Sequence, residues 1–362
     1  MHMDIFNDDA FSATSMTTAI ETYEYQPGLI SSMNLFDNVP IATTTVSVEK
    51  RGNGFELIPT TLRGEPLAEG RRDDRNIRMF PTRRIAKGHT LQASEIQNVR
   101  AFGTESELET AIGYVARYQQ RLMREVEATW EFMRLGAVFG KVMDASGSVV
   151  VDWFNEWTIT RPAAIDFALD TAGTNVEQKC RDVLRRVQDV VDERWLPNSS
   201  VVGLAGDSFF DKLTGHAKVT DTYLNQSQAN TLNRAFGVAT QSGFRAGSYA
   251  TFEYGGILFI NYKGSKTFKK TDAEGDNSGK EAFGVRSTRC KFFPINAPGV
   301  FQEAFAPGES FEWANTIGRP VYSLILRDKD RDFWMRPEVY SYPLFICTVP
   351  EALFEAKESA SA

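Results

Sequence analysis

A single long helical pattern over residues 104–141 constrains this chain more than any other feature. Thr104 followed three residues later by Glu107 predicts a capping box at its start, and Gly136 and Gly140 mark its far end. At about 1.5 Å per residue the helix would be roughly 50 Å long. It is either a core helix of an α+β enzyme or a spine that crosses the protein and carries separate lobes. The apolar residues recur at steps of three or four, which places them on one helix face: Leu108, Ile112, Val115, Tyr118, Leu122, Val126, Trp130, Met133 and Ala137.

The composition is that of a folded chain with about two domains, given 362 residues and a hydrophobic fraction of 42%. A formal net charge of −7 argues against a general nucleic-acid binder. No apolar run approaches the ~20 residues that span a membrane, and residues 1–10 are acidic, unlike a signal peptide. Cys180, Cys290 and Cys347 are widely spaced without a CxxC, which fits reduced thiols better than a disulfide framework or a zinc site.

Residues 45–90 are predicted to form a long two-stranded excursion with a charged tip. The β-branched run 41–48 and the turn signal at 51–54 predict a hairpin whose second strand is 55–62. A further strand-like run covers 77–85, and the stretch before it has little to bury. Because an isolated hairpin is only marginally stable in water, the excursion lies either on another protein or on its own domain.

Strands both precede and follow the helices in the rest of the chain, which predicts an α+β fold. A hairpin is expected at 141–157, with its turn at 144–147. Residues 263–283, rich in Gly, Ser and Lys, are expected to form a long mobile loop. The other expected elements are helices at 176–195, 207–213 and 223–236, strands at 200–204, 285–295 and 321–326, a strand pair at 249–262, and a hydrophobic final strand at 339–349.

The search for catalytic motifs yields none. His89 and His216 lie in no recognisable catalytic pattern. Residues 275–280 have the wrong glycine spacing for a phosphate loop, and residues 328–339 lack the Gly and Glu of a calcium loop. We therefore predict no catalytic residue, no cofactor-binding residue and no metal ligand, and the interpretation moves from an enzyme to a structural or binding protein.

The order of the pieces resembles that of the phage capsid protein E family, the major capsid proteins of lambda-like tailed phages. The local match is best in 122–127 with 136–142, in 291–307 and in 340–353. The resemblance implies a Hong Kong 97-type fold and a structural role. The chain would be the major capsid subunit of a phage or prophage, assembling as hexamers and pentamers of an icosahedral virion shell around double-stranded DNA in the bacterial host cytoplasm.

The resemblance also divides the chain. Residues 1–44 would be an N-terminal arm, and 45–101 an extended loop that overlaps a neighbouring subunit. Residues 102–157, completed by 337–362, would form the peripheral domain with the spine helix, and 158–336 the axial domain. Partners would be other copies, a scaffold, a decoration protein, the portal and loosely held DNA, with no membrane. The expected inter-subunit contact residues of the extended loop are Arg71, Arg72, Asp73, Asp74, Arg75, Arg83 and Arg84.

Two alternatives remain open at this point. An encapsulin-like compartment shell would have the same fold, although the C-terminal match favours the phage capsid. An unrelated α+β enzyme with a mobile loop would be favoured by a pocket that joins His89 or His216 to buried carboxylates.

Overall fold

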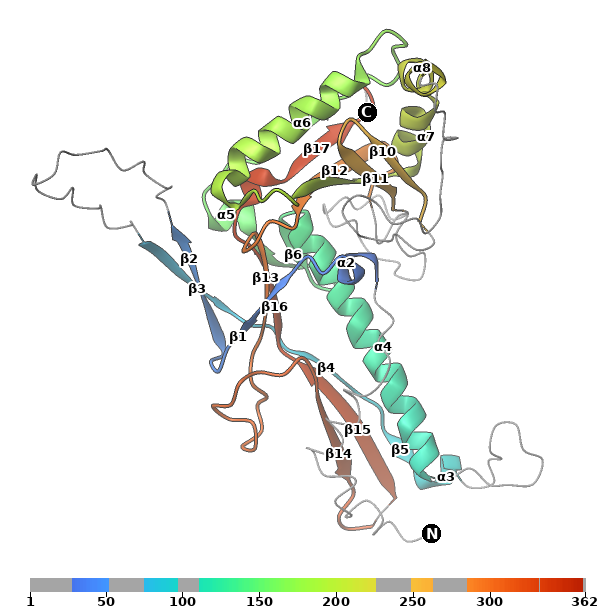
Figure 1. The fold of residues 1–362 in the computed structure, drawn as a ribbon. Coiled ribbons are helices and arrows are strands. Elements are labelled where there is room, and N and C mark those ends of the chain that lie inside the picture. Colours follow the sequence, from blue (N-terminus) through green and yellow to red (C-terminus); the bar gives the residue numbers. More distant parts are fainter. Residues whose placement is uncertain are drawn as a thin grey trace, which may run out of the picture.

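The computed structural model describes residues 28–51, 75–96, 111–225, 249–262, 285–331 and 333–360. The molecule is elongated, with an upper lobe, a lower sheet and one long helix, α4 (Ala111–Val138), that runs between them (Figure 1). Helices and strands are both present and intermixed, so the predicted α+β class is confirmed.

Helix α4 is the expected spine. Its 28 described residues correspond to about 42 Å. The start predicted at Thr104 lies outside the described residues. At the other end Gly140 adopts a φ of +80°, a left-handed conformation that glycine accepts without strain and that ends the helix. The predicted apolar face is buried at Val115, Leu122, Val126, Trp130, Met133 and Ala137.

The upper lobe is built on a six-stranded sheet in the order β10-β11-β9-β12-β17-β8. Phenylalanine rings fill its core: the ring centroids of Phe167 and Phe209 lie 5.4 Å apart, and those of Phe259 and Phe292 6.0 Å apart. Helices α6, α7 and α8 accompany the sheet (Figure 1). The elements are β8 (Ile165–Asp166), α6 (Val176–Val191), β9 (Ser200–Ala205), α7 (Asp207–Gly215), α8 (Ala217–Asn225), β10 (Thr251–Tyr254), β11 (Ile257–Asn261), β12 (Arg289–Ile295) and β17 (Phe354–Lys357).

Two smaller sheets lie along α4. The middle sheet has the order β1-β13-β16, and the lower sheet has the order β14-β15-β4 with β5 also paired to β15. Short elements complete the structure, among them the predicted hairpin β6–β7. The bounds are α2 (Leu29–Ser32), β1 (Asp37–Pro40), β4 (Ile85–Gly88), β5 (Leu91–Gln92), α3 (Ala93–Ile96), β6 (Lys141–Met143), β7 (Val149–Asp152), α5 (Trp153–Glu156), η3 (Asp192–Arg194), β13 (Phe301–Phe305), β14 (Tyr322–Arg327), β15 (Trp334–Ser341), β16 (Pro343–Cys347) and η4 (Pro350–Ala352).

The single final strand expected at 339–349 is wrong. The chain there forms β15 and β16, which belong to different sheets and are separated by Tyr342. Pro343 has no N–H to continue a ladder, while the Tyr342 carbonyl accepts a hydrogen bond from Ala306 N at 3.0 Å. The chain therefore crosses from the lower to the middle sheet at this point, and the unexpected strand β17 follows in the upper lobe.

Other expectations differ in detail. Helix α7 begins at Asp207 as expected, with Gly206 as its N-cap, and it continues to Gly215, beyond the expected end at 213. The helix expected at 223–236 and the loop at 263–283 lie almost wholly outside the described residues. The four domain ranges stay a prediction. Several strand pairings cross them, among them those of β4 and β5 with β15 and that of β17 with β12.

Candidate assembly surfaces

Two antiparallel strands, β2 (Thr45–Arg51) and β3 (Arg75–Pro81), form a ribbon that projects from the body (Figure 1). Val46 pairs with Phe80 and Val48 with Arg78. The described pairing is seven residues long, about 23 Å. The excursion is therefore two-stranded as expected, and the described partner of β2 is β3. The returning strand expected at 55–62 lies outside the described part of the chain.

One face of the ribbon is anchored at its base. The ring centroid of Phe80 lies 5.1 Å from that of Trp153 and 6.2 Å from that of Trp157. The Arg78 guanidinium lies 5.6 Å over the Trp157 ring and adds a cation–π contact. The opposite face is open, because Met79 is 71% exposed. The ribbon thus presents one face to α5 and the other to solvent.

The structure describes only part of the predicted charged contact set. Arg71, Arg72, Asp73 and Asp74 lie outside the described residues, and Arg75 is the first residue of β3, in register with Arg51. Arg83 and Arg84 are exposed in the connection from β3 to β4. Arg84 Nη1 lies 3.1 Å from Glu309 Oε2 of the same chain. Sequence reasoning missed Glu309, since it is distant in sequence and lies in an irregular loop.

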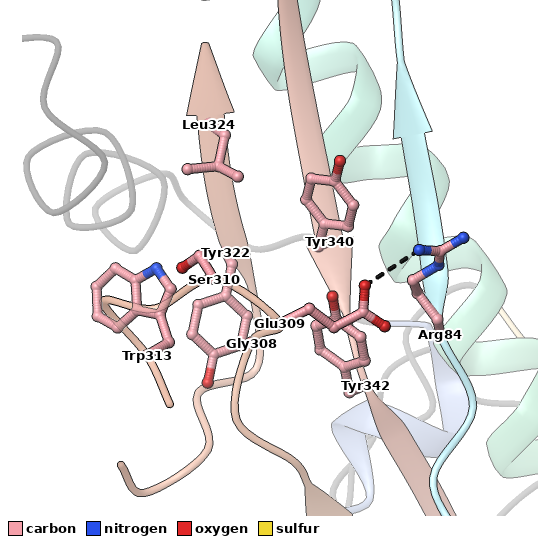
Figure 2. A pocket seen from close by; sticks show the side chains of 9 residues that line it. All are labelled: Arg84, Gly308, Glu309, Ser310, Trp313, Tyr322, Leu324, Tyr340 and Tyr342. Carbon is pink, nitrogen blue, oxygen red and sulfur yellow. Dashed lines mark hydrogen bonds and ion pairs between the residues drawn. The ribbon is translucent and has the colours of Figure 1, made fainter. Parts of the chain in front are cut away.

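Arg84 and Glu309 border an aromatic hollow of about 220 Å³ (Figure 2). Its rings come from the lower sheet and from the connection between β13 and β14. The Trp313 and Tyr322 centroids are 5.3 Å apart, and those of Tyr322 and Tyr342 are 6.1 Å apart. Burial, followed by the nearby Glu309 charge, raises the pKa of Tyr342 to about 12. The aromatic rings that line the hollow pack against one another and hold the exposed loop between β13 and β14 in place.

Two apolar side chains project from that same loop. Phe311 is fully exposed and Ile317 is 66% exposed. In sequence they lie on either side of Trp313, which is buried and whose ring is covered by the Arg319 guanidinium at 4.9 Å. The loop therefore has a fixed inner side and an apolar outer side.

The two histidines considered for catalysis have structural surroundings. His216 is buried, with Nε2 3.1 Å from the Thr171 carbonyl and Nδ1 accepting from Lys218 N at 3.3 Å. The His89 ring stacks on Tyr118 at 4.6 Å. Within the described ranges, no three or more His, Cys, Asp or Glu side chains are grouped so that they could hold a metal ion. None of the described helices is long and apolar enough to cross a membrane.

Comparison of the sequence with known protein families identifies a match over most of the chain. The family profile for phage major capsid protein E matches residues 12–358. The chain belongs to the phage major capsid protein E family. It is 27% identical to the major capsid protein of Salmonella phage Felix O1 over 359 residues, covering 97% of each chain. It is also 27% identical to the major capsid protein of Pseudomonas phage KPP10 over 330 residues, covering 89% of this chain and 90% of that protein.

A solved structure confirms the expected fold of this phage major capsid protein E member. The candidate capsid protein of a prophage of Escherichia coli CFT073 superposes with a TM-score of 0.59 at 12% identity, covering 96% of this chain and 99% of that one. The Hong Kong 97-type fold is therefore confirmed. The role expected from the resemblance, major capsid protein of a tailed phage or prophage, is confirmed by the family.

Proposed function

We propose that copies of this chain assemble as hexamers and pentamers of an icosahedral shell enclosing double-stranded DNA, with the ribbon of each subunit lying on a neighbour. The ribbon carries this proposal. It is held by one face at its base, and the Met79 face is open to solvent. Because an isolated two-stranded ribbon is marginal in water, a neighbouring subunit that covers the open face would stabilise it.

The proposed inter-subunit contacts of the extended loop are Arg71, Arg72, Asp73, Asp74, Arg75, Arg83 and Arg84. They combine both signs of charge, and such charges fix register and orientation more than they add affinity. Exposed ion pairs contribute only ~0–1 kcal/mol each. The strength of the shell would therefore come from repetition around closed rings.

Apolar contacts would supply most of the affinity. Phe311 and Ile317 project from the loop beside the aromatic hollow. Burying one such side chain fully is worth ~1.5–3 kcal/mol. Each subunit would repeat this contribution, and the packed side of the loop would keep its loss of freedom on assembly small.

The finer organisation follows the family resemblance. We propose an N-terminal arm at 1–44, an extended loop at 45–101, a peripheral domain at 102–157 completed by 337–362, and an axial domain at 158–336. Further proposed partners are a scaffold, a decoration protein, the portal and loosely held DNA. Assembly would take place in the bacterial host cytoplasm.

Electron microscopy of the purified protein across concentration and salt tests the proposal. Wild-type protein is expected to give closed shells, rings or tubes. The triple variant Arg71→Glu, Arg72→Glu, Arg75→Glu should remain folded and fail to assemble. A matched control carries the same charge change on α6, at Arg181, Arg185 and Arg186, which are exposed. Normal shells from the loop variant would refute the role of the excursion, and loss of shells in both variants would point to a general charge effect.

A further inference from the structure

The exposed loop between β13 and β14 carries a projecting aromatic ring directly beside the aromatic hollow. Phe311 is fully exposed. Its close sequence neighbours Ser310 and Trp313 line the hollow (Figure 2). A hydrogen bond from Trp313 N to the Ser310 carbonyl at 3.1 Å closes a turn, and Phe311 lies at its corner. One turn therefore presents both a projecting apolar group and part of a concave apolar surface.

The same turn keeps Phe311 out of the hollow of its own subunit. Both ends of the turn belong to the lining, so the ring at the corner could enter only if the hydrogen bond that closes the turn were broken. The base of the loop is also fixed, because Arg319 N donates a hydrogen bond to the Tyr322 hydroxyl at 2.8 Å. A ring that fills the hollow must therefore come from another molecule.

The hollow has the size and the lining that a phenyl ring requires. Its volume is about 220 Å³. An apolar cavity of ~150 Å³ is already large enough to hold benzene. Tyr322, Tyr340 and Tyr342 line it from the lower sheet, and Leu324 adds an aliphatic side chain (Figure 2). Aromatic rings gain attraction from one another in edge-to-face and offset arrangements, so this lining favours an aromatic occupant.

The charges around the hollow favour an uncharged occupant. Arg84 Nη1 lies 3.1 Å from Glu309 Oε2 at the rim. On the same face of the lower sheet, Arg336 Nε lies 3.0 Å from Glu338 Oε1. Each positive group thus has a negative partner, and neither a cation nor an anion would gain a net electrostatic attraction on entering. A neutral phenyl ring matches this surface.

Two polar atoms of the lining indicate that the ring arrives on a polypeptide. Trp313 Nε1 and Ser310 Oγ are buried, and neither has a hydrogen-bond partner within the described ranges. Trp313 is only 7% exposed. Buried donors are normally paired, because leaving them unpaired costs free energy. A peptide segment that inserts a phenyl ring also brings backbone carbonyls, and one of these can accept a hydrogen bond from the indole N–H.

We propose that Phe311 of one subunit inserts into the aromatic hollow of a second copy of this chain. The inference rests on the proposed shell, in which copies meet one another, and it names the contact that this loop makes. Because the ring and the hollow belong to one loop, copies related by a rotation axis can exchange rings in a closed arrangement. Each copy then gives one ring and receives one.

Photo-cross-linking between isotopically distinct copies tests the contact. Incorporating p-azidophenylalanine at Phe311 keeps the aromatic ring and adds a small photoreactive group. Subunits of natural isotope content are mixed with ¹⁵N-labelled subunits, allowed to assemble and irradiated. Mass spectrometry should then find the Phe311 peptide joined to peptides that contain Leu324 or Tyr340, in pairs with one labelled and one unlabelled member.

Phe333 offers a matched control for this cross-link. It is 63% exposed and directly precedes β15, at the opposite end of the lower sheet from Tyr342. The same photoreactive residue at Phe333 should give no cross-link to the peptides of the hollow.

Substitutions measure the contribution of the contact to assembly. Phe311→Ser should raise the protein concentration at half assembly about tenfold or more, because tenfold corresponds to ~1.4 kcal/mol and burial of a phenyl ring supplies at least that. Phe333→Ser should leave it within a factor of about two. Leu324→Trp fills the hollow and should act like Phe311→Ser. The double variant should be no worse than either single one, because both remove the same contact.

The unfolding midpoint of the unassembled subunit shows whether each variant is folded. Phe311 is fully exposed, so Phe311→Ser should leave the midpoint unchanged and still decides the question if Leu324→Trp fails to fold.

The outcomes separate this contact from the shell itself. Shells that form from Phe311→Ser at the wild-type concentration would overturn the contact and leave the shell proposal intact. Cross-links only between peptides of equal isotope content would place Phe311 against its own chain and would also overturn it. Mixed cross-links in a wild-type-like protein that forms no shell would support the contact and refute the shell. The absence of both would refute both.

Discussion

Replacing Phe80 by alanine is expected to loosen the ribbon from the body. Phe80 is only 6% exposed, and its ring contacts Trp153 and Trp157 of the segment that follows β7. Phe-to-Ala changes in cores cost ~3–5 kcal/mol. The ribbon can separate locally, so we expect the low end, about 3 kcal/mol, which makes the detached state roughly 100-fold more populated.

Hydrogen exchange measures this local opening directly. Amides of β2 and β3 should exchange roughly 100-fold faster in Phe80→Ala, while amides of the upper lobe keep their rates. Met79→Ala is the matched control, because Met79 is the next residue along β3 and is 71% exposed. It should leave exchange within a factor of about two, since exposed substitutions change stability by less than ~0.5 kcal/mol. Equal exchange rates in the two variants would refute the anchoring of the ribbon through Phe80.

Three further predictions concern the body of the subunit. Arg134→Met should destabilise by ~3–5 kcal/mol in denaturant unfolding because it leaves Glu303, 16% exposed, unpaired, and adding Glu303→Gln should recover more than half. Gly140→Ala should cost more than ~1 kcal/mol because of its φ of +80°, while Gly173→Ala, with no atom within 4 Å of the added Cβ, should change the unfolding midpoint little. The pKa of Tyr342 is raised from 10.0 to about 12, which means that the folded state favours the neutral phenol. The contribution of Tyr342 to the free energy of unfolding is therefore fully present below pH 10 and is lost as the pH rises through 12. Tyr342→Phe should make that loss smaller in a pH series of unfolding midpoints.

The elements that sequence reasoning predicted best have strong periodicity. The apolar stripe of α4 recurs every three or four residues, and the structure buries it from Val115 to Ala137. Helix α6 likewise follows its pattern, with Asn175 accepting from Gln178 N at 3.1 Å as its cap. In both cases the spacing of apolar residues along the helix predicts which face is buried, so the helix can be predicted without knowing its tertiary contacts.

Long-range pairing was harder to predict. The partner of β2 depends on strand register over an insertion of more than twenty residues, and a local turn signal at 51–54 suggested a nearer strand. The break at Tyr342 arises because adjacent strands serve two sheets, although the run of residues is apolar throughout. A short hydrophobic run predicts that a segment is buried, but it does not predict which strand the segment pairs with.

The Arg134 network was not predictable, because it joins three segments that are far apart in sequence. Its guanidinium contacts Glu303 at 2.8 Å and Ser31 Oγ at 2.6 Å, and Glu131 on the same helix holds the backbone of α2. A buried ionic cluster of this kind is weak evidence for stability, since removing both charges can be nearly neutral. The network does fix the relative positions of the three segments, because the guanidinium donates, and the carboxylates accept, hydrogen bonds only in a narrow range of geometry.

The network and the ribbon have complementary positions in the subunit. The network lies where α2, α4 and β13 meet, so the elements that join the upper lobe to the lower sheet are fixed by directional buried contacts. The ribbon is held through one face at its base, by the packing of Phe80 and by the partly exposed contacts of Arg78 with Trp157 and Glu156. We therefore expect the angle of the ribbon to vary between subunits more readily than the body does. The proposed six-membered and five-membered rings need different angles between neighbouring subunits, and a ribbon held through one partly exposed face would supply that difference.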